Sequence, residues 1–203
     1  MRTNLDVIEA RENWIPSGYF NTLEALNELI QHISIDGHPA ATGRGSTTPK
    51  ILFVGEALGQ NEEIQRKPFV GAAGQVLDAL LREAGFDERT PYYITNAVKI
   101  RPIDENGQNR APTVWEVWFW EPILREEIRL LNPAIIVPLG LVPSAFFLNE
   151  AREEFRMGDV HGKLFEWEKR KVMPTYHPAS TLYRPEMRPV LLADLKRIYD
   201  LLR

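Results

Sequence analysis

The sequence contains no cysteine among its 203 residues. This absence excludes disulfide bonds, a thiolate nucleophile, and any zinc or iron–sulfur site built on cysteine ligands. The four histidines, His32, His38, His161 and His177, also lack the spacing of a zinc motif. We therefore expect neither a metal ion nor another cofactor.

An excess of basic residues and long apolar runs are lacking as well. Lys and Arg number 24 against 28 Asp and Glu, for a formal net charge of -4. This balance excludes a general basic coat for nucleic acid but leaves room for a local basic patch. No stretch reaches the roughly 18 apolar residues of a spanning helix, and the charged residues 1–14 do not resemble a signal peptide. We expect a cytoplasmic protein that does not bind a membrane.

The length fits one domain, which we expect to span residues 1–203. Within it, residues 1–49 are predicted to be an N-terminal extension. It consists of a helix over 21–33 and a loop over 36–49, rich in Gly, Pro, Ser and Thr and without core-forming side chains. Residues 50–203 are predicted to form the α/β core.

Short β-rich runs alternate with helical stretches through this core. Strands are predicted at 51–55, 92–98, 134–140 and 171–176. Helices are predicted at 72–84, 113–131, 142–150 and 189–202. This alternation indicates a three-layer α/β/α sandwich around a mainly parallel four-stranded central sheet.

Polar residues follow the predicted strands at their carboxyl ends, where parallel α/β sheets bind ligands. Glu56 follows the first strand, Asn96 lies near the end of the second, and His177 follows the fourth. Each has a structural alternative: a solvated turn for Glu56, a buried amide for Asn96, and a packing role for His177. Together they form a candidate site, and the amide of Asn96 offers the donor and acceptor that match an edge of uracil.

Other side chains near these strand ends have two interpretations each. Phe69, which precedes a glycine-rich turn, is either a core residue or a stacking surface for a base. Lys99 and Arg101 are either phosphate contacts or a solvated strand end. The segment Leu182-Tyr183-Arg184 has the composition of an apolar wedge followed by a phosphate contact.

Four blocks of the sequence, in this order, resemble the uracil-DNA glycosylase superfamily, closest to the family 4 enzymes of bacteria and archaea. They are Gly55-Glu56-Ala57-Leu58-Gly59, Pro68-Phe69-Val70-Gly71-Ala72-Ala73-Gly74-Gln75, Ile94-Thr95-Asn96-Ala97-Val98-Lys99 and His177-Pro178-Ala179. The resemblance covers residues 50–203. It implies a prokaryotic, nucleoid-associated, monomeric enzyme of base excision repair. Such an enzyme flips uracil out of single- or double-stranded DNA and hydrolyses its glycosidic bond, leaving an abasic site.

The resemblance also implies roles for individual residues. Those expected to take part in catalysis are Glu56, Asn96 and His177, with Asn61 and Glu62 as secondary candidates. Those expected to bind uracil are Glu56, Ala57, Phe69, Asn96 and His177. Those expected to contact DNA are Lys99, Arg101, Ser180, Leu182 and Arg184.

The sequence departs from the family pattern in several places. Family 4 enzymes carry a four-cysteine iron–sulfur cluster, and here Ile100 and Trp120 stand at two of the expected ligand positions. We expect Trp115, Trp118 and Trp120 to fill that volume with apolar packing. Leu58 replaces a proline of the first motif. The segment 101–112 has no histidine, so the covalent trapping of DNA seen in a close relative is not expected.

Three alternatives remain open at this point. A glycosylase of the same fold would remove hypoxanthine, xanthine or mismatched thymine instead of uracil. A catalytically degenerate homologue would only bind DNA. A nucleotide-binding protein unrelated to repair is disfavoured because the sequence lacks both a G-x-G-x-x-G fingerprint and a P-loop.

Overall fold

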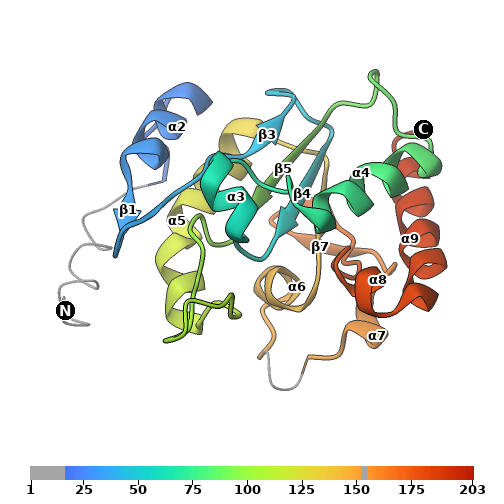
Figure 1. The fold of residues 1–203 in the computed structure, drawn as a ribbon. Coiled ribbons are helices and arrows are strands. Elements are labelled where there is room, and N and C mark those ends of the chain that lie inside the picture. Colours follow the sequence, from blue (N-terminus) through green and yellow to red (C-terminus); the bar gives the residue numbers. More distant parts are fainter. Residues whose placement is uncertain (1–16, 152–154) are drawn as a thin grey trace.

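The computed structural model describes residues 17–151 and 155–203. The prediction that residues 1–14 do not form a signal peptide lies outside the described residues. Six strands form one sheet in the order β3-β5-β4-β6-β8-β7 (Figure 1). They are β3 (Arg44–Gly45), β4 (Ile51–Gly55), β5 (Tyr92–Asn96), β6 (Ile135–Pro138), β7 (Phe165–Trp167) and β8 (Arg170–Val172). The four central strands are parallel, and β3 and β7 are antiparallel edge strands.

Helices cover both faces of this sheet. They are α2 (Leu23–His32), α3 (Gln60–Gln65), α4 (Ala72–Ala84), α5 (Val114–Leu131), α6 (Leu141–Leu148), α7 (Met157–Val160), α8 (Ser180–Tyr183) and α9 (Arg188–Asp200), with a 3-10 turn at Pro185–Met187. No helix within the described residues is long and apolar enough to cross a membrane.

Strand β4 shows why the fold has three layers. All five of its residues are buried, and successive side chains of a strand point to opposite faces. Leu52 and Val54 join the core beneath α2 and α5, whereas Ile51 and Phe53 join the core beneath α4 and α9. The predicted α/β/α sandwich with a parallel four-stranded centre is confirmed, and two antiparallel edge strands extend it.

Two predicted helix ends are also present in the structure. The side chain of Thr113 accepts a hydrogen bond from the Glu116 amide, and Glu116 binds the Thr113 amide in return, which completes a capping box at the start of α5. Gly85 ends α4 with a φ of 101°, a left-handed conformation that glycine adopts without steric cost.

The prediction for residues 36–49 is wrong in part. This segment contains β2 (His38–Pro39), which pairs with β1 (Ser34–Ile35), and β3, which pairs with β5. Ala40 and Ala41 are buried, although the segment was expected to hold no core side chains. Pairing with a distant strand creates this order, because the local composition itself favours a loop.

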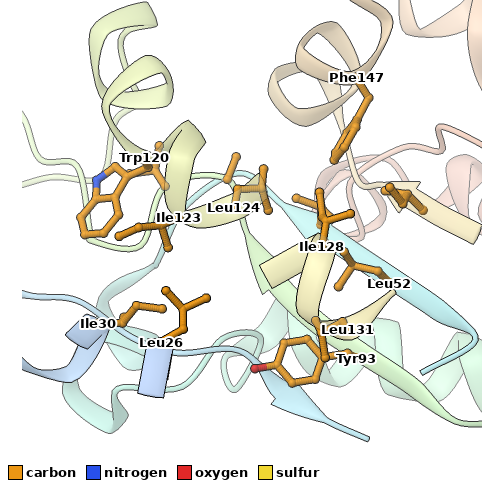
Figure 2. Packing of buried hydrophobic residues seen from close by; sticks show 14 of the residues in the cluster. Leu26, Ile30, Leu52, Tyr93, Trp120, Ile123, Leu124, Ile128, Leu131 and Phe147 are labelled. Atoms are coloured by element: carbon orange, nitrogen blue, oxygen red, sulfur yellow. The ribbon is translucent and has the colours of Figure 1, made fainter. Parts of the chain in front are cut away.

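The layer formed by α2 and α5 is packed with apolar side chains. In Figure 2 the Trp120 ring and Ile123 of α5 face Leu26 and Ile30 of α2. Trp120 is 0% exposed, whereas Trp115 is 53% exposed. The expected filling of this volume by three tryptophans therefore holds for Trp120 and fails for Trp115, whose position in the first turn of α5 faces outward.

Candidate functional site

A cavity of about 460 Å³ lies at the carboxyl ends of the parallel strands. The sequence-predicted residues that line it are Glu56, Ala57, Asn61, Glu62, Phe69 and His177. Asn109 and Arg110, which the sequence analysis did not single out, line it as well. The cavity therefore brings together side chains from the ends of separate strands, as the parallel topology requires.

Asn96 lies behind this lining, at the last position of β5. It pairs in register with Gly55 of β4 and is only 3% exposed. A Cβ at Gly55 would collide with Asn96 Oδ1 and would come within 2.5 Å of the Phe69 ring. The missing side chain at Gly55 thus allows the amide and the ring to approach each other.

The side-chain oxygen of Asn96 has no hydrogen-bond partner within the described part of the chain. Buried polar atoms are nearly always paired, and leaving one unpaired costs about 1–3 kcal/mol. This buried acceptor beside an aromatic ring is therefore available to a donor group of a ligand.

His177 is held in one tautomer. Its Nδ1 accepts the amide N–H of Ala179 at 3.2 Å, so the proton of the neutral ring lies on Nε2. Burial lowers the pKa of His177 to about 4, with the Glu62 carboxylate opposing the shift. The ring is therefore a neutral hydrogen-bond donor near pH 7. Its centroid lies 5.6 Å from that of Phe69.

Phe69 is presented by a backbone in an unusual conformation. Its φ is 55°, a left-handed value that is a genuine outlier for a bulky residue. A Cβ at Gly74 would collide with the Phe69 carbonyl, so the glycine allows this loop to lie directly against α4. On the other side, Glu62 accepts hydrogen bonds from the amides of Val70 and Gly71, at 3.1 and 2.7 Å.

Glu62 is a secondary catalytic candidate in the sequence. Its Oε1 holds the loop that follows Phe69, and its catalytic role stays a prediction. Glu56 reaches the cavity because the pairing of β4 and β5 continues past the strand ends. The carbonyls of Gly55 and Glu56 accept the amides of Ala97 and Val98, at 2.9 and 3.0 Å.

The prediction that Lys99 contacts DNA is wrong. The side chain is 1% exposed, and its ammonium donates to Thr95 Oγ1, to the Asn96 carbonyl and to Glu127. Glu127 is itself 0% exposed. A buried charge requires such a partner, and this one comes from α5, 28 positions along the chain. Lys99 therefore supports the backbone of Asn96 from inside the core.

The other predicted DNA contacts differ in their environment. Arg101 is partly buried and donates to Asn109, Glu63 and the Gly107 carbonyl, so its donors are used inside the protein. Ser180 and Leu182 lie on the helical turn α8, directly after His177, and Arg184 caps its end. Leu182 is 47% exposed. An exposed apolar side chain three positions after Ala179, which lines the cavity, is compatible with the predicted wedge, which stays a prediction.

Sequence reasoning also missed Arg44 and the ion pair between Lys99 and Glu127. Arg44 donates to the carbonyls of Pro68 and Phe69, at 3.0 and 3.2 Å. A positively charged residue in a segment rich in Gly, Ser and Thr carries no local signal of such a contact. Only the pairing of β3 with β5 places Arg44 near the cavity.

The residues at the expected cluster positions do not fit an iron–sulfur cluster. Ile100 is 6% exposed and Trp120 is 0% exposed, and both belong to the apolar core beneath α2 and α5. The chain has no cysteine, and the described residues contain no group of three or more His, Asp or Glu side chains placed to hold a metal. Apolar packing occupies this region instead.

The sequence is also similar to those of known proteins. The family model of the uracil DNA glycosylase superfamily matches residues 42–201. The chain is 39% identical over 167 residues to a type-4 uracil-DNA glycosylase of Sulfurisphaera tokodaii, covering 80% of this chain and 74% of the relative. It is 37% identical over 192 residues to the type-4 enzyme of Archaeoglobus fulgidus, covering 88% and 94%. The chain is also 32% identical over 160 residues to a DNA polymerase of Bacillus phage SP01. This match covers 79% of the chain and 16% of the polymerase.

Proposed function

The chain belongs to the uracil-DNA glycosylase superfamily, and from that premise we propose that it excises uracil from DNA as a monofunctional glycosylase. The observation that carries the proposal is the buried, unpaired Oδ1 of Asn96 beside the Phe69 ring. Uracil offers an N3–H donor for this oxygen and an O4 acceptor for the amide N–H₂. Phe69 supplies an apolar face for the ring of the base.

The reaction breaks the bond between the sugar C1′ and the base N1. The bonding electrons leave with uracil, so negative charge develops on its O2. A water molecule adds to C1′ and loses one proton, and the uracil anion takes up a proton, so the products are an abasic sugar and neutral uracil. A donor placed where charge develops lowers the barrier, by about 2.7–4 kcal/mol for a single oxyanion donor. In this proposal the Nε2–H of neutral His177 donates to O2, and Glu56 orients the attacking water.

The base must leave the helical stack before it enters the cavity. Unstacking costs a few kcal/mol and is easiest in a mismatch or a single strand. Leu182 on α8 is exposed and follows the cavity-lining Ala179 by three residues, and in this proposal it fills the space that the flipped nucleotide leaves. The backbone of Ala57 borders the bound base.

The test uses labelled oligonucleotides that contain uracil, hypoxanthine or thymine, either single-stranded or paired with guanine or adenine. Each is incubated with the purified protein and then treated with alkali to cut abasic sites. We expect cleavage at uracil, lost in His177→Ala and retained in the control His32→Ala, whose histidine lies on α2.

Two other outcomes would contradict the proposal in different ways. Cleavage at hypoxanthine or thymine without cleavage at uracil would keep the mechanism and change the substrate. Binding of all these oligonucleotides without cleavage would identify a DNA-binding homologue that has no glycosylase activity.

A further inference from the structure

Arg44 reaches the Phe69 loop from an edge strand outside every motif of the site. Its Nε donates to the Pro68 carbonyl at 3.0 Å, and one Nη donates to the Phe69 carbonyl at 3.2 Å. The same Nη lies 3.2 Å from the carboxylate of Asp78, on α4. These contacts tie the loop to both β3 and α4.

The Phe69 backbone is in a conformation that needs such support. A left-handed φ in a bulky residue is strained and persists only where the surroundings determine it. Glu62 holds the amides of Val70 and Gly71 on one side of the loop. Arg44 holds the carbonyls of Pro68 and Phe69 on the other, so the peptide group between Phe69 and Val70 is bound at both its carbonyl and its amide.

We propose that Arg44 is a positioning residue for the base-stacking ring of Phe69. The inference rests on the proposed function, because it gives the ring its role. Strand β3 pairs antiparallel with β5, with Arg44 opposite Ile94, two positions before Asn96. Arg44 therefore connects the strand that ends in the base-reading amide to the loop that carries the stacking ring.

The geometry explains why arginine serves this purpose. A guanidinium is a planar fork of donors that can bind two carbonyls and a carboxylate at once, whereas a lysine ammonium is a compact point charge on a flexible stem. Arg44→Lys should therefore restore only part of the effect. Arg44→Met keeps most of the apolar stem and removes every donor.

The test is a double-mutant cycle measured by single-turnover excision of uracil from a labelled oligonucleotide. A small displacement of a positioning element lowers rates strongly, so Arg44→Met should lower the rate about 10- to 100-fold. In a Phe69→Ala background the same substitution should lower it by less than about threefold, because residues that act through one another are not additive. A purely structural role would lower the rate equally in both backgrounds.

A matched control is Arg89→Met, since Arg89 also pairs with an aspartate, Asp87, but lies in the turn after α4. Its rate should stay within twofold of the wild type. An unchanged rate in Arg44→Met, or equal losses in both backgrounds, would overturn the inference. If Arg44→Met does not fold, the cycle is measured with Arg44→Lys, whose smaller loss should likewise vanish in Phe69→Ala.

Amide hydrogen exchange gives a second measurement that does not depend on excision. The amides of Val70 and Gly71 should exchange faster in Arg44→Met than in the wild type, while those of β4 should not change. If the wild type fails to release uracil, the proposed function fails and this exchange alone decides whether Arg44 holds the loop. Equal exchange in the two proteins would overturn the inference by itself.

Discussion

Two regions of this protein differ in how closely their residues match the family pattern. At the strand ends, Glu56, Phe69 and His177 of the cavity and Asn96 behind it match the family pattern, whereas the cavity residue Leu58 departs from it. The layer between α2 and α5 does not carry the cysteine ligands expected at positions 100 and 120. Ile100 and Trp120 stand there and are buried in an apolar core.

The difference follows from what each region must supply. In the proposed function, the chemistry at the cavity depends on individual atoms, namely the Nε2–H of His177 and the Oδ1 of Asn96. A structural support depends on volume and rigidity, which apolar side chains provide at native packing density. Substitutions in the two regions should therefore separate stability from activity.

Trp120→Ala should have the largest effect, and it should fall on stability. Removing a fully buried tryptophan leaves a cavity and costs about 3–5 kcal/mol. Denaturant unfolding followed by tryptophan fluorescence or circular dichroism measures this loss. The rate of uracil excision per folded molecule should stay near the wild-type value. A folded Trp120→Ala protein without activity would show that the two regions are not separable.

His177→Ala should have a comparable effect of the opposite kind. Loss of one donor to the developing charge should lower the single-turnover rate about 10²- to 10³-fold, with little change in DNA affinity. Single-turnover excision assays measure the rate, and fluorescence anisotropy with a labelled oligonucleotide measures the DNA affinity separately. Equal activity in the variant would remove His177 from its proposed role.

Asn96→Asp should have the next largest effect. The carboxylate cannot donate to uracil O4, and loss of a buried hydrogen bond costs about 1–3 kcal/mol, so uracil excision should fall about 5- to 150-fold. The ratio of rates on uracil and thymine opposite guanine shows whether discrimination is lost as well. Normal uracil excision by this variant would contradict the base-reading role.

A smaller effect is expected from pH. The pKa of His177 is about 4 in the folded protein, below the ordinary value near 6.5, so the ring stays neutral between pH 5 and 8. The rate ratio of wild type to His177→Gln should be constant over this range. The unfolded chain binds the proton more readily, so the folded state loses stability relative to His177→Gln as pH falls from 6.5 toward 4. An NMR titration of His177 with a midpoint near 6.5 would contradict both expectations.

Treatment with an iron chelator should change neither stability nor activity. Because the residues at the cluster positions are apolar, incubation with an iron chelator should change neither the melting temperature nor the excision rate. Metal analysis of the purified protein measures iron directly. Stoichiometric iron would show that the protein binds it through ligands other than the substituted positions.

Much of the fold was predictable because its signals are local. The buried β-rich runs of β4 and β5, the capping box at Thr113 and the glycine at position 85 all act within a few residues. The edge strand β3 was not predictable, since its two residues, Arg44 and Gly45, become a strand only by pairing with β5. Glu56, Asn96 and His177 were predicted from their positions at strand ends, and Phe69 from the glycine-rich turn and the family resemblance. The structure brings Glu56, Phe69 and His177 to one cavity with Asn96 directly behind it.

The error at Lys99 shows where local reasoning fails. A lysine at a strand end is solvated by default, and only the buried carboxylate of Glu127 makes the interior acceptable for it. That partner is set by the packing of α5 on the sheet, which no pattern around Lys99 reveals. The same holds for Arg44, whose contacts depend on two segments separated by 24 positions.

The sequence by itself determined the layered α/β class, the order of the motifs and the absence of cysteine chemistry, because periodicity, strand-end position and composition act along the chain. The tertiary structure alone decided which polar side chains face the cavity and which support it from within. It also decided the tautomer and lowered pKa of His177. These properties depend on burial and on partners far away in sequence, and both exist only once the sheet and its helices have packed.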